Sequence, residues 1–286
     1  MKERKRLGNI LFATDLSEDS AHAIDWLQWF CGYYGSTAYI VYVLNLFLFG
    51  LSAEEIAQTR SIASKRFDRF VRKYRLNQKA FTQKLILGDA AVAVTEFVGK
   101  HDIALVVLGS RAIWLNRFLR GSISEEVFRS VDCPVLTVGP LAKSPRSSVG
   151  ISRVLFATNM AKQSGSVLTY CEFLFKGNPH SGIALAHFLP KESKSVFERH
   201  KTRKLLQAKL INLVPEEMRC QIDDVVVESC SPVKGILEFS ADGRADVIIL
   251  AVKDAGPLTR AATHRPRSIT HQIIQSATCP VLTIRV

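Results

Sequence analysis

Short apolar segments rich in branched side chains alternate, in the first half of the chain, with longer segments whose apolar residues recur every three or four positions. The first pattern is typical of buried strands and the second of helices with one apolar face. The predicted strands cover residues 9–13, 38–44, 81–87, 104–108 and 135–138. The predicted helices run from an N-cap at Ser17 to about Phe30, from 52 to 74, from 90 to 100 and from 122 to 130. This alternation indicates β-α units around a parallel sheet.

The second half of the chain repeats the first. Ile-Leu-Phe-Ala-Thr-Asp at 10–15 returns as Val-Leu-Phe-Ala-Thr-Asn at 154–159, and Cys-Pro-Val-Leu-Thr at 133–137 returns at 279–283. The two offsets, 144 and 146 residues, are so close that we infer a duplication. We therefore predict an α/β protein with two tandem doubly wound parallel sheets of five strands each. The predicted domains are residues 1–142 and 150–286, joined by a linker rich in proline and serine.

The second repeat follows the same order of elements. Its second helix is predicted within residues 195–213, its third strand at 221–227 and its last strand at 280–284.

Composition and charge narrow the function. A chain of 286 residues that is 47% hydrophobic has enough apolar side chains for two cores. Its net charge of +12 favours anionic partners. Much of that charge lies in helical runs such as 66–75 and 199–204, without interleaved aromatic residues or a zinc-finger or RNA-binding signature. We therefore do not expect the protein to bind nucleic acid.

The sequence favours a soluble, cytoplasmic protein. Its six cysteines form no C-x-x-C pair, which is typical of reduced thiols, and the basic N-terminus lacks the apolar core of a secretion signal. Residues 26–53 carry no charge, but the turn-like residues 31–37 divide them into a helix end and a buried strand. We do not expect a membrane partner; peripheral contact through 46–51 is the alternative.

Candidate ligand-binding residues come from position alone. In an open parallel sheet, ligands bind beyond the carboxyl ends of the strands. Free backbone N–H groups at the start of the fourth helix could hold phosphate oxygens there. In the first repeat the residues at this edge are Asp15, Val43, Gly109, Arg111, Gly121, Ser122, Ile123 and Ser124.

Simpler interpretations of these residues stay open. Asp15 could serve only to orient the first helix, Ser122 could serve only as the cap of the fourth helix, and the Arg111 side chain could lie in solvent without binding a ligand. The chain contains no G-x-S-x-G elbow, P-loop lysine motif or H-E-x-x-H. We accordingly predict neither a catalytic residue nor a metal-ligating residue.

At these residues the sequence resembles the ATP-binding type of the universal stress protein family. The resemblance covers essentially the whole chain, once in each repeat. That type has an acid after its first strand and a loop of the form Gly, two residues, Gly, nine residues, Gly, Ser or Thr. Here the loop is Gly109-Ser-Arg-Ala112, eight residues, then Gly121-Ser122. The loop is thus one residue short, with Ala112 in place of the second glycine.

The resemblance implies a Rossmann-like fold of the adenine nucleotide alpha hydrolase type. It further implies that Asp15 and Val43 contact adenosine. Gly109, Gly121, Ser122 and Ser124 would then contact the phosphates of ATP, and Mg²⁺ is expected with the triphosphate.

The second repeat departs from this pattern, with Asn159, Ala251 and Arg267 in place of Asp15, Gly109 and Gly121. We interpret it as mainly structural. The expected function is a stress-response protein that binds an adenine nucleotide and is not an enzyme. The alternatives are a nucleotide-free scaffold for an unknown protein partner and a weak ATP hydrolase.

The resemblance also implies assembly through the last strand of each domain. Residues 135–138 would then pair with 281–284 inside one chain, as an internal pseudo-dimer, with a further homodimer as an additional possibility. An unpaired apolar edge of this kind would favour aggregation.

Overall fold

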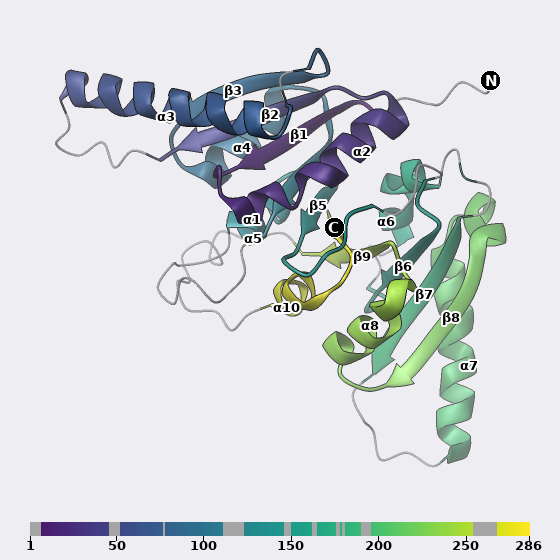
Figure 1. The fold of residues 1–286 in the computed structure, drawn as a ribbon. Helices are drawn as coiled ribbons and strands as arrows, with labels where there is room; N and C mark the ends of the chain where they lie inside the picture. The colour runs from purple at the N-terminus through teal and green to yellow at the C-terminus, as the bar shows by residue number, and fades with distance from the viewer. Residues whose placement is uncertain are drawn as a thin grey trace.

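The computed structural model describes residues 7–45, 52–76, 78–110, 123–145, 150–161, 165–175, 178, 181–189, 196–253 and 268–286. Within these residues, each repeat forms five parallel strands with helices between them (Figure 1). The α/β fold class and the doubly wound topology expected from the sequence are therefore confirmed.

The strands lie close to their predicted positions. In the first repeat they are β1 (Asn9–Thr14), β2 (Ala38–Leu44), β3 (Phe81–Leu87), β4 (Ile103–Gly109) and β5 (Val135–Val138). In the second they are β6 (Arg153–Ala157), β7 (Gly182–Leu189), β8 (Ile222–Ser229), β9 (Val247–Val252) and β10 (Val281–Arg285).

The helices connect these strands. The first repeat has α1 (Glu18–Ala21), α2 (Ile24–Tyr34), α3 (Ala53–Lys73), α4 (Ala90–Lys100) and α5 (Ile123–Phe128). The second has α6 (Gly165–Tyr170), α7 (Val196–Leu213), α8 (Pro232–Ser240) and α10 (Ile269–Ser276), with short 3-10 turns η3 (Glu172–Leu174), η4 (Glu216–Gln221) and η5 (Ala241–Gly243).

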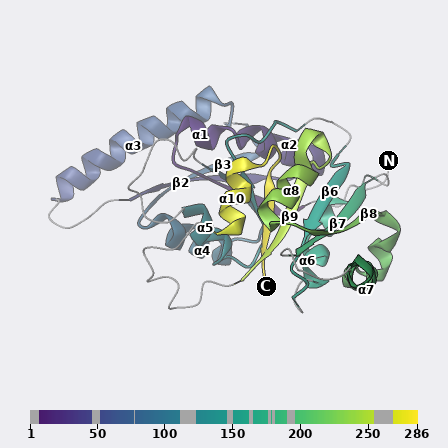
Figure 2. The ribbon, with the colours of Figure 1, turned by 90° about the horizontal axis from the view of Figure 1, so that it is seen from below.

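The inner strands of the sheet are buried on both faces, which is why they appear in the sequence as nearly continuous apolar runs, whereas the edge strands β3 and β8 carry exposed polar residues. Along β1, the buried residues Ile10 and Phe12 join one apolar core and Leu11 joins the other. Helices α2, α3, α6 and α7 contribute to the first core, and α4, α5, α8 and α10 to the second. The longest helix of each repeat is α3 in the first and α7 in the second, and the two lie at opposite ends of the molecule (Figures 1 and 2).

Local signals in the sequence account for several helix boundaries. Ser52 and Glu55 form a reciprocal capping box at the start of α3. Asp89 accepts hydrogen bonds from two backbone N–H groups at the start of α4. Gly35, with a φ of 65°, ends α2 in the left-handed conformation that glycine adopts without strain.

The predicted N-cap at Ser17 is confirmed, because its side chain accepts a hydrogen bond from the N–H of Ser20, but the single helix predicted from there to about Phe30 is wrong. The structure has α1 and then α2, which continues to Tyr34. The backbone N–H of Ala23 donates to Ser20 O, three residues earlier, which tightens the chain at the break. The Ser20 hydroxyl is bonded to Thr14 Oγ1, at 2.7 Å, so contact with β1 fixes the short first helix.

One antiparallel pair of strands joins the two repeats. The order across the ten-stranded sheet is β3-β2-β1-β4-β5-β10-β9-β6-β7-β8. At the junction Leu136 lies opposite Leu282, and both are fully buried. The pairing of 135–138 with the last strand, expected from the sequence, is present. Among the described residues, no helix is long and apolar enough to cross a membrane.

We predict that residues 1–142, expressed alone, will self-associate or precipitate, because β5 would then present a fully buried apolar strand as an open edge. The full chain, in which β10 covers that edge, is the control. Sedimentation velocity distinguishes the outcomes, and a well-behaved monomeric first repeat would contradict the prediction.

Candidate functional site

A tight turn follows β1 and holds Asp15 at the carboxyl edge of the sheet. Thr14 Oγ1 accepts a hydrogen bond from the N–H of Leu16, at 3.0 Å, and Leu16 adopts a φ of 62°. Asp15 Oδ1 accepts from the N–H of Ser17, also at 3.0 Å, and from the Ser17 hydroxyl. The Asp15 side chain is exposed at this position. The turn thus orients the carboxylate while leaving it accessible to solvent.

The second repeat makes the same turn without the charge. Thr158 Oγ1 accepts from the N–H of Met160 at 2.9 Å, and Met160 has a φ of 58°. Asn159 Oδ1 accepts from the N–H of Ala161 at 3.1 Å, as Asp15 does from Ser17. Because an amide oxygen suffices for the turn, the negative charge of Asp15 is not needed to build it.

Gly109 ends β4 beside this turn, and its missing side chain has a packing reason. A Cβ built there would lie 2.5 Å from Ser20 Cα and 3.0 Å from the carbonyl oxygens of Asp19 and Ser20. Helix α1 therefore occupies the space beside Gly109, so the missing side chain makes room for the helix. Contact of Gly109 with phosphate stays a prediction.

Val43 lies half-buried near the end of β2. The registers β1–β2 and β6–β7 place Phe188 at the corresponding position of the second repeat. The Phe188 ring packs so closely on Gly235 of α8 that a Cβ on this glycine would overlap it. A larger side chain thus fills, in the second repeat, the position predicted to contact adenosine in the first.

Ile123 and Ser124 begin the described part of α5, and two acids follow them in its first turn. Arg129 pairs with Glu125 Oε1 at 3.2 Å, whereas Glu126 is exposed. Acids are favourable near a helix N-terminus, where they would compete with a bound phosphate. Both glutamates are visible in the sequence, so this competition could have been predicted there.

Three predicted residues, Arg111, Gly121 and Ser122, lie outside the described residues. In the second repeat, Ser268 stands at the position equivalent to Ser122. It caps α10 by accepting a hydrogen bond from the N–H of His271 at 3.1 Å. This supports the capping alternative for serine at this position and leaves phosphate contact in the first repeat a prediction.

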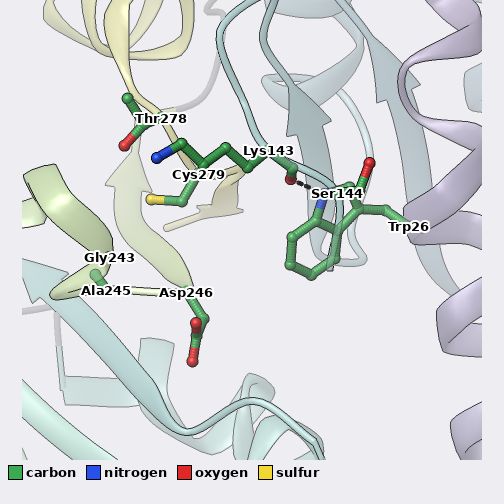
Figure 3. A pocket seen from close by; sticks show the side chains of 8 residues that line it. All are labelled: Trp26, Lys143, Ser144, Gly243, Ala245, Asp246, Thr278 and Cys279. Atoms are coloured by element: carbon green, nitrogen blue, oxygen red, sulfur yellow. Dashed lines mark hydrogen bonds between the residues drawn. The ribbon is translucent and has the colours of Figure 1, made fainter. Parts of the chain in front are cut away.

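A small pocket lies far from this edge, where the linker crosses the amino ends of β9 and β10 (Figure 3). Trp26 Nε1 donates to the carbonyl oxygen of Lys143 at 3.0 Å, and the N–H of Lys143 donates to Thr278 O, also at 3.0 Å. The Ser144 hydroxyl lies 2.5 Å from Asp25 Oδ2. The pocket volume is about 20 Å³, enough for about one water. We therefore interpret it as part of the docked linker.

Burial makes at least two of the cysteines unreactive. All six are free thiols. Burial raises the pKa of Cys31 and of Cys133 to about 12, so neither forms a thiolate near neutral pH. Among the described residues there is no cluster of three or more histidines, cysteines or acids arranged to hold a metal ion.

Comparison with known proteins fits this geometry. The profile of the universal stress protein family matches residues 7–139 and again residues 151–285. The chain belongs to the universal stress protein family. No curated protein sequence matches it.

Solved structures of two universal stress proteins share the tandem fold, and a third matches about half of the chain. One from Archaeoglobus fulgidus is 21% identical, with a TM-score of 0.69, covering 98% of this chain and 97% of that one. A putative universal stress protein from Pseudomonas aeruginosa is 12% identical, with a TM-score of 0.54, covering 100% of this chain and 95% of the other. A universal stress protein in complex with cAMP covers 46% of this chain and 95% of its own, at 20% identity and a TM-score of 0.34.

The close contact at Gly109 gives a stability prediction for this universal stress protein. Gly109→Ala should lower the free energy of unfolding by about 1–3 kcal/mol, because α1 must move away from β4. Gly32→Ala is the matched control: no atom lies within 4 Å of its Cβ, so in α2 it should stabilise by about 0.5–1 kcal/mol. Urea unfolding measures both, and equal effects of the two substitutions would contradict the packing role of Gly109.

Proposed function

We propose that the first repeat binds an adenine nucleotide, with ATP the leading candidate, and that the second repeat is its structural partner. The observation that carries this proposal is the position of Asp15 and Gly109. Asp15 directly follows β1 and Gly109 ends β4, and at these two adjacent strands the direction of the crossover connections reverses. In doubly wound sheets such a reversal opens the crevice in which ligands bind.

The chemistry of this edge supports the proposal. The Asp15 carboxylate is exposed and its turn does not need the charge, and carboxylate oxygens accept hydrogen bonds of the kind that a ribose or an adenine donates. Val43 offers an apolar surface on the neighbouring strand. The phosphates would lie toward Gly121, Ser122 and Ser124, with Arg111 adding positive charge and Mg²⁺ accompanying a triphosphate.

We also infer that the junction of β5 and β10 takes the place of an interface between two separate copies, which makes the chain an internal pseudo-dimer. The fully buried residues of both strands support this inference. We further propose a binding role without catalysis, in the cytoplasm, where six free thiols are chemically suited.

A nucleotide-free scaffold is the second candidate. Two observations favour it: the packing reason for Gly109 and the acidic first turn of α5, with Glu125 and Glu126. On this alternative the carboxyl edge of the sheet would contact a protein partner.

Calorimetry with ATP, AMP and cAMP tests the proposal. ATP should bind the full chain, and Gly121→Arg should abolish binding while the melting temperature changes little, because the arginine fills the phosphate position. Gly32→Arg, at an exposed site with no atom within 4 Å of its Cβ, is the matched control and should bind as the wild type does. Absence of binding to all three ligands, or unchanged affinity of Gly121→Arg, would contradict the proposal.

Asp15 offers a separate test of adenosine recognition. Asp15→Asn keeps the oxygen that holds the turn, as Asn159 does, so stability should change by less than about 0.5 kcal/mol. Loss of a charged acceptor should nevertheless weaken ATP binding by about tenfold or more. Asp15→Ala should weaken binding and also lower stability. If Asp15→Asn leaves the affinity unchanged, Asp15 serves only to orient α1.

A further inference from the structure

Two polar contacts connect the second repeat to the residues on either side of segment 111–122. Gln275 Nε2 of α10 donates to Ser110 Oγ at 2.6 Å. Arg129, directly after α5, donates from Nη1 to the carbonyl oxygen of Lys253, directly after β9, at 2.9 Å. Ser110 is the last described residue before the segment, and α5 is the first element after it. The second repeat therefore forms a hydrogen bond on each side of the segment, with Ser110 before it and with Arg129 after it.

The contact between Gln275 and Ser110 is enclosed. The exposed fraction is 9% for Gln275 and 5% for Ser110. The N–H of Ser110 donates to Val138 O at 2.9 Å, so its backbone is fixed to β5 while its hydroxyl is bonded to α10. Removal of the Gln275 amide would leave a buried hydroxyl without this partner, which is unfavourable.

Helix α10 has little freedom to move relative to this corner. Gly139 follows β5, and a Cβ built on it would overlap the carbonyl oxygen of Ile274. Helix and strand therefore pack backbone against backbone, one residue before Gln275. The amide of Gln275 is thus presented to Ser110 from a fixed position.

The same crossing is made in the opposite direction. Arg129 is the equivalent of Gln275 at the repeat offset of 146 residues, and Lys253 follows Val252, the equivalent of Ser110. Glu125 Oε1 holds the Arg129 guanidinium at 3.2 and 3.3 Å. In each repeat, a side chain in the last helix or directly after it thus donates a hydrogen bond to a residue at the end of the fourth strand of the other repeat.

We propose that Gln275 and Arg129 are positioning residues, through which the second repeat fixes the flanks of the nucleotide site of the first. The inference rests on the proposed function. A site whose flanks are already ordered does not have to order them on binding, so the second repeat contributes to affinity without touching the ligand. It then supports the site as well as covering the edge of β5.

The test replaces Gln275 in the full chain with methionine, which has a similar length and cannot make the hydrogen bond. Gln275→Met should weaken ATP binding by about fivefold, the expected loss for one hydrogen bond. Exchange of the Ser110 amide, followed by NMR, should become faster, while amides of β1 exchange as before. Ser110→Ala should weaken binding similarly, and the double variant should be no weaker than either single variant.

Gln207→Met is the matched control. Gln207 Nε2 donates to Val225 O at 3.0 Å, entirely within the second repeat. This variant should change neither the ATP affinity nor the exchange of the Ser110 amide.

Each outcome is decisive. Unchanged affinity and unchanged Ser110 exchange in Gln275→Met would overturn the inference, as would uniformly faster exchange throughout the chain, which indicates a general loss of stability. If the wild type binds no nucleotide, the proposed function fails, and the Ser110 amide still decides whether Gln275 fixes this flank: local acceleration supports it, and none overturns it.

Discussion

The antiparallel pair of β5 and β10 is the interaction on which the rest of the molecule depends. Each repeat ends in a short apolar strand, and neither strand could remain open to water without inviting association with another chain. Their pairing buries Leu136 and Leu282 completely and makes one continuous sheet from two. It also brings α10 against the end of β5. The two can pack this closely because Gly139 has no side chain. The hydrogen bond from Gln275 to Ser110 follows from this placement.

The duplication has produced two similar frameworks with different chemistry at their carboxyl edges. The turn after the first strand has the same backbone form in both, with Leu16 and Met160 in the left-handed region. The first repeat has a carboxylate in this turn and the second an amide. At the end of the second strand, the first repeat has Val43 and the second has the larger Phe188 at the equivalent position. A nucleotide site in the first repeat and a supporting role for the second are consistent with this asymmetry.

The sequence predicted the strands well, because burial on both faces makes most of the inner strands distinct apolar runs. The pairing of the two final strands was implied by the resemblance to the universal stress protein family, and their matching sequences from Cys133 and Cys279 onward located the two strands. The break between α1 and α2 was not, because it depends on the contact of Ser20 with Thr14 and on the close approach of Gly109. The hydrogen bond from Gln275 to Ser110 spans 165 residues, and no local pattern indicates it. The duplicated Ala-Thr at 13–14 and 157–158 was the one visible sign of the shared turn.

Mass spectrometry of the small molecules released when the purified full-length protein is denatured tests the central claim most directly. If the first repeat is a nucleotide site, ATP or another adenine nucleotide should be recovered from the wild type in an amount comparable to the protein, and should be missing from Gly121→Arg. Recovery of no nucleotide from wild-type protein that also fails to take up added ATP would contradict the account and favour the nucleotide-free scaffold.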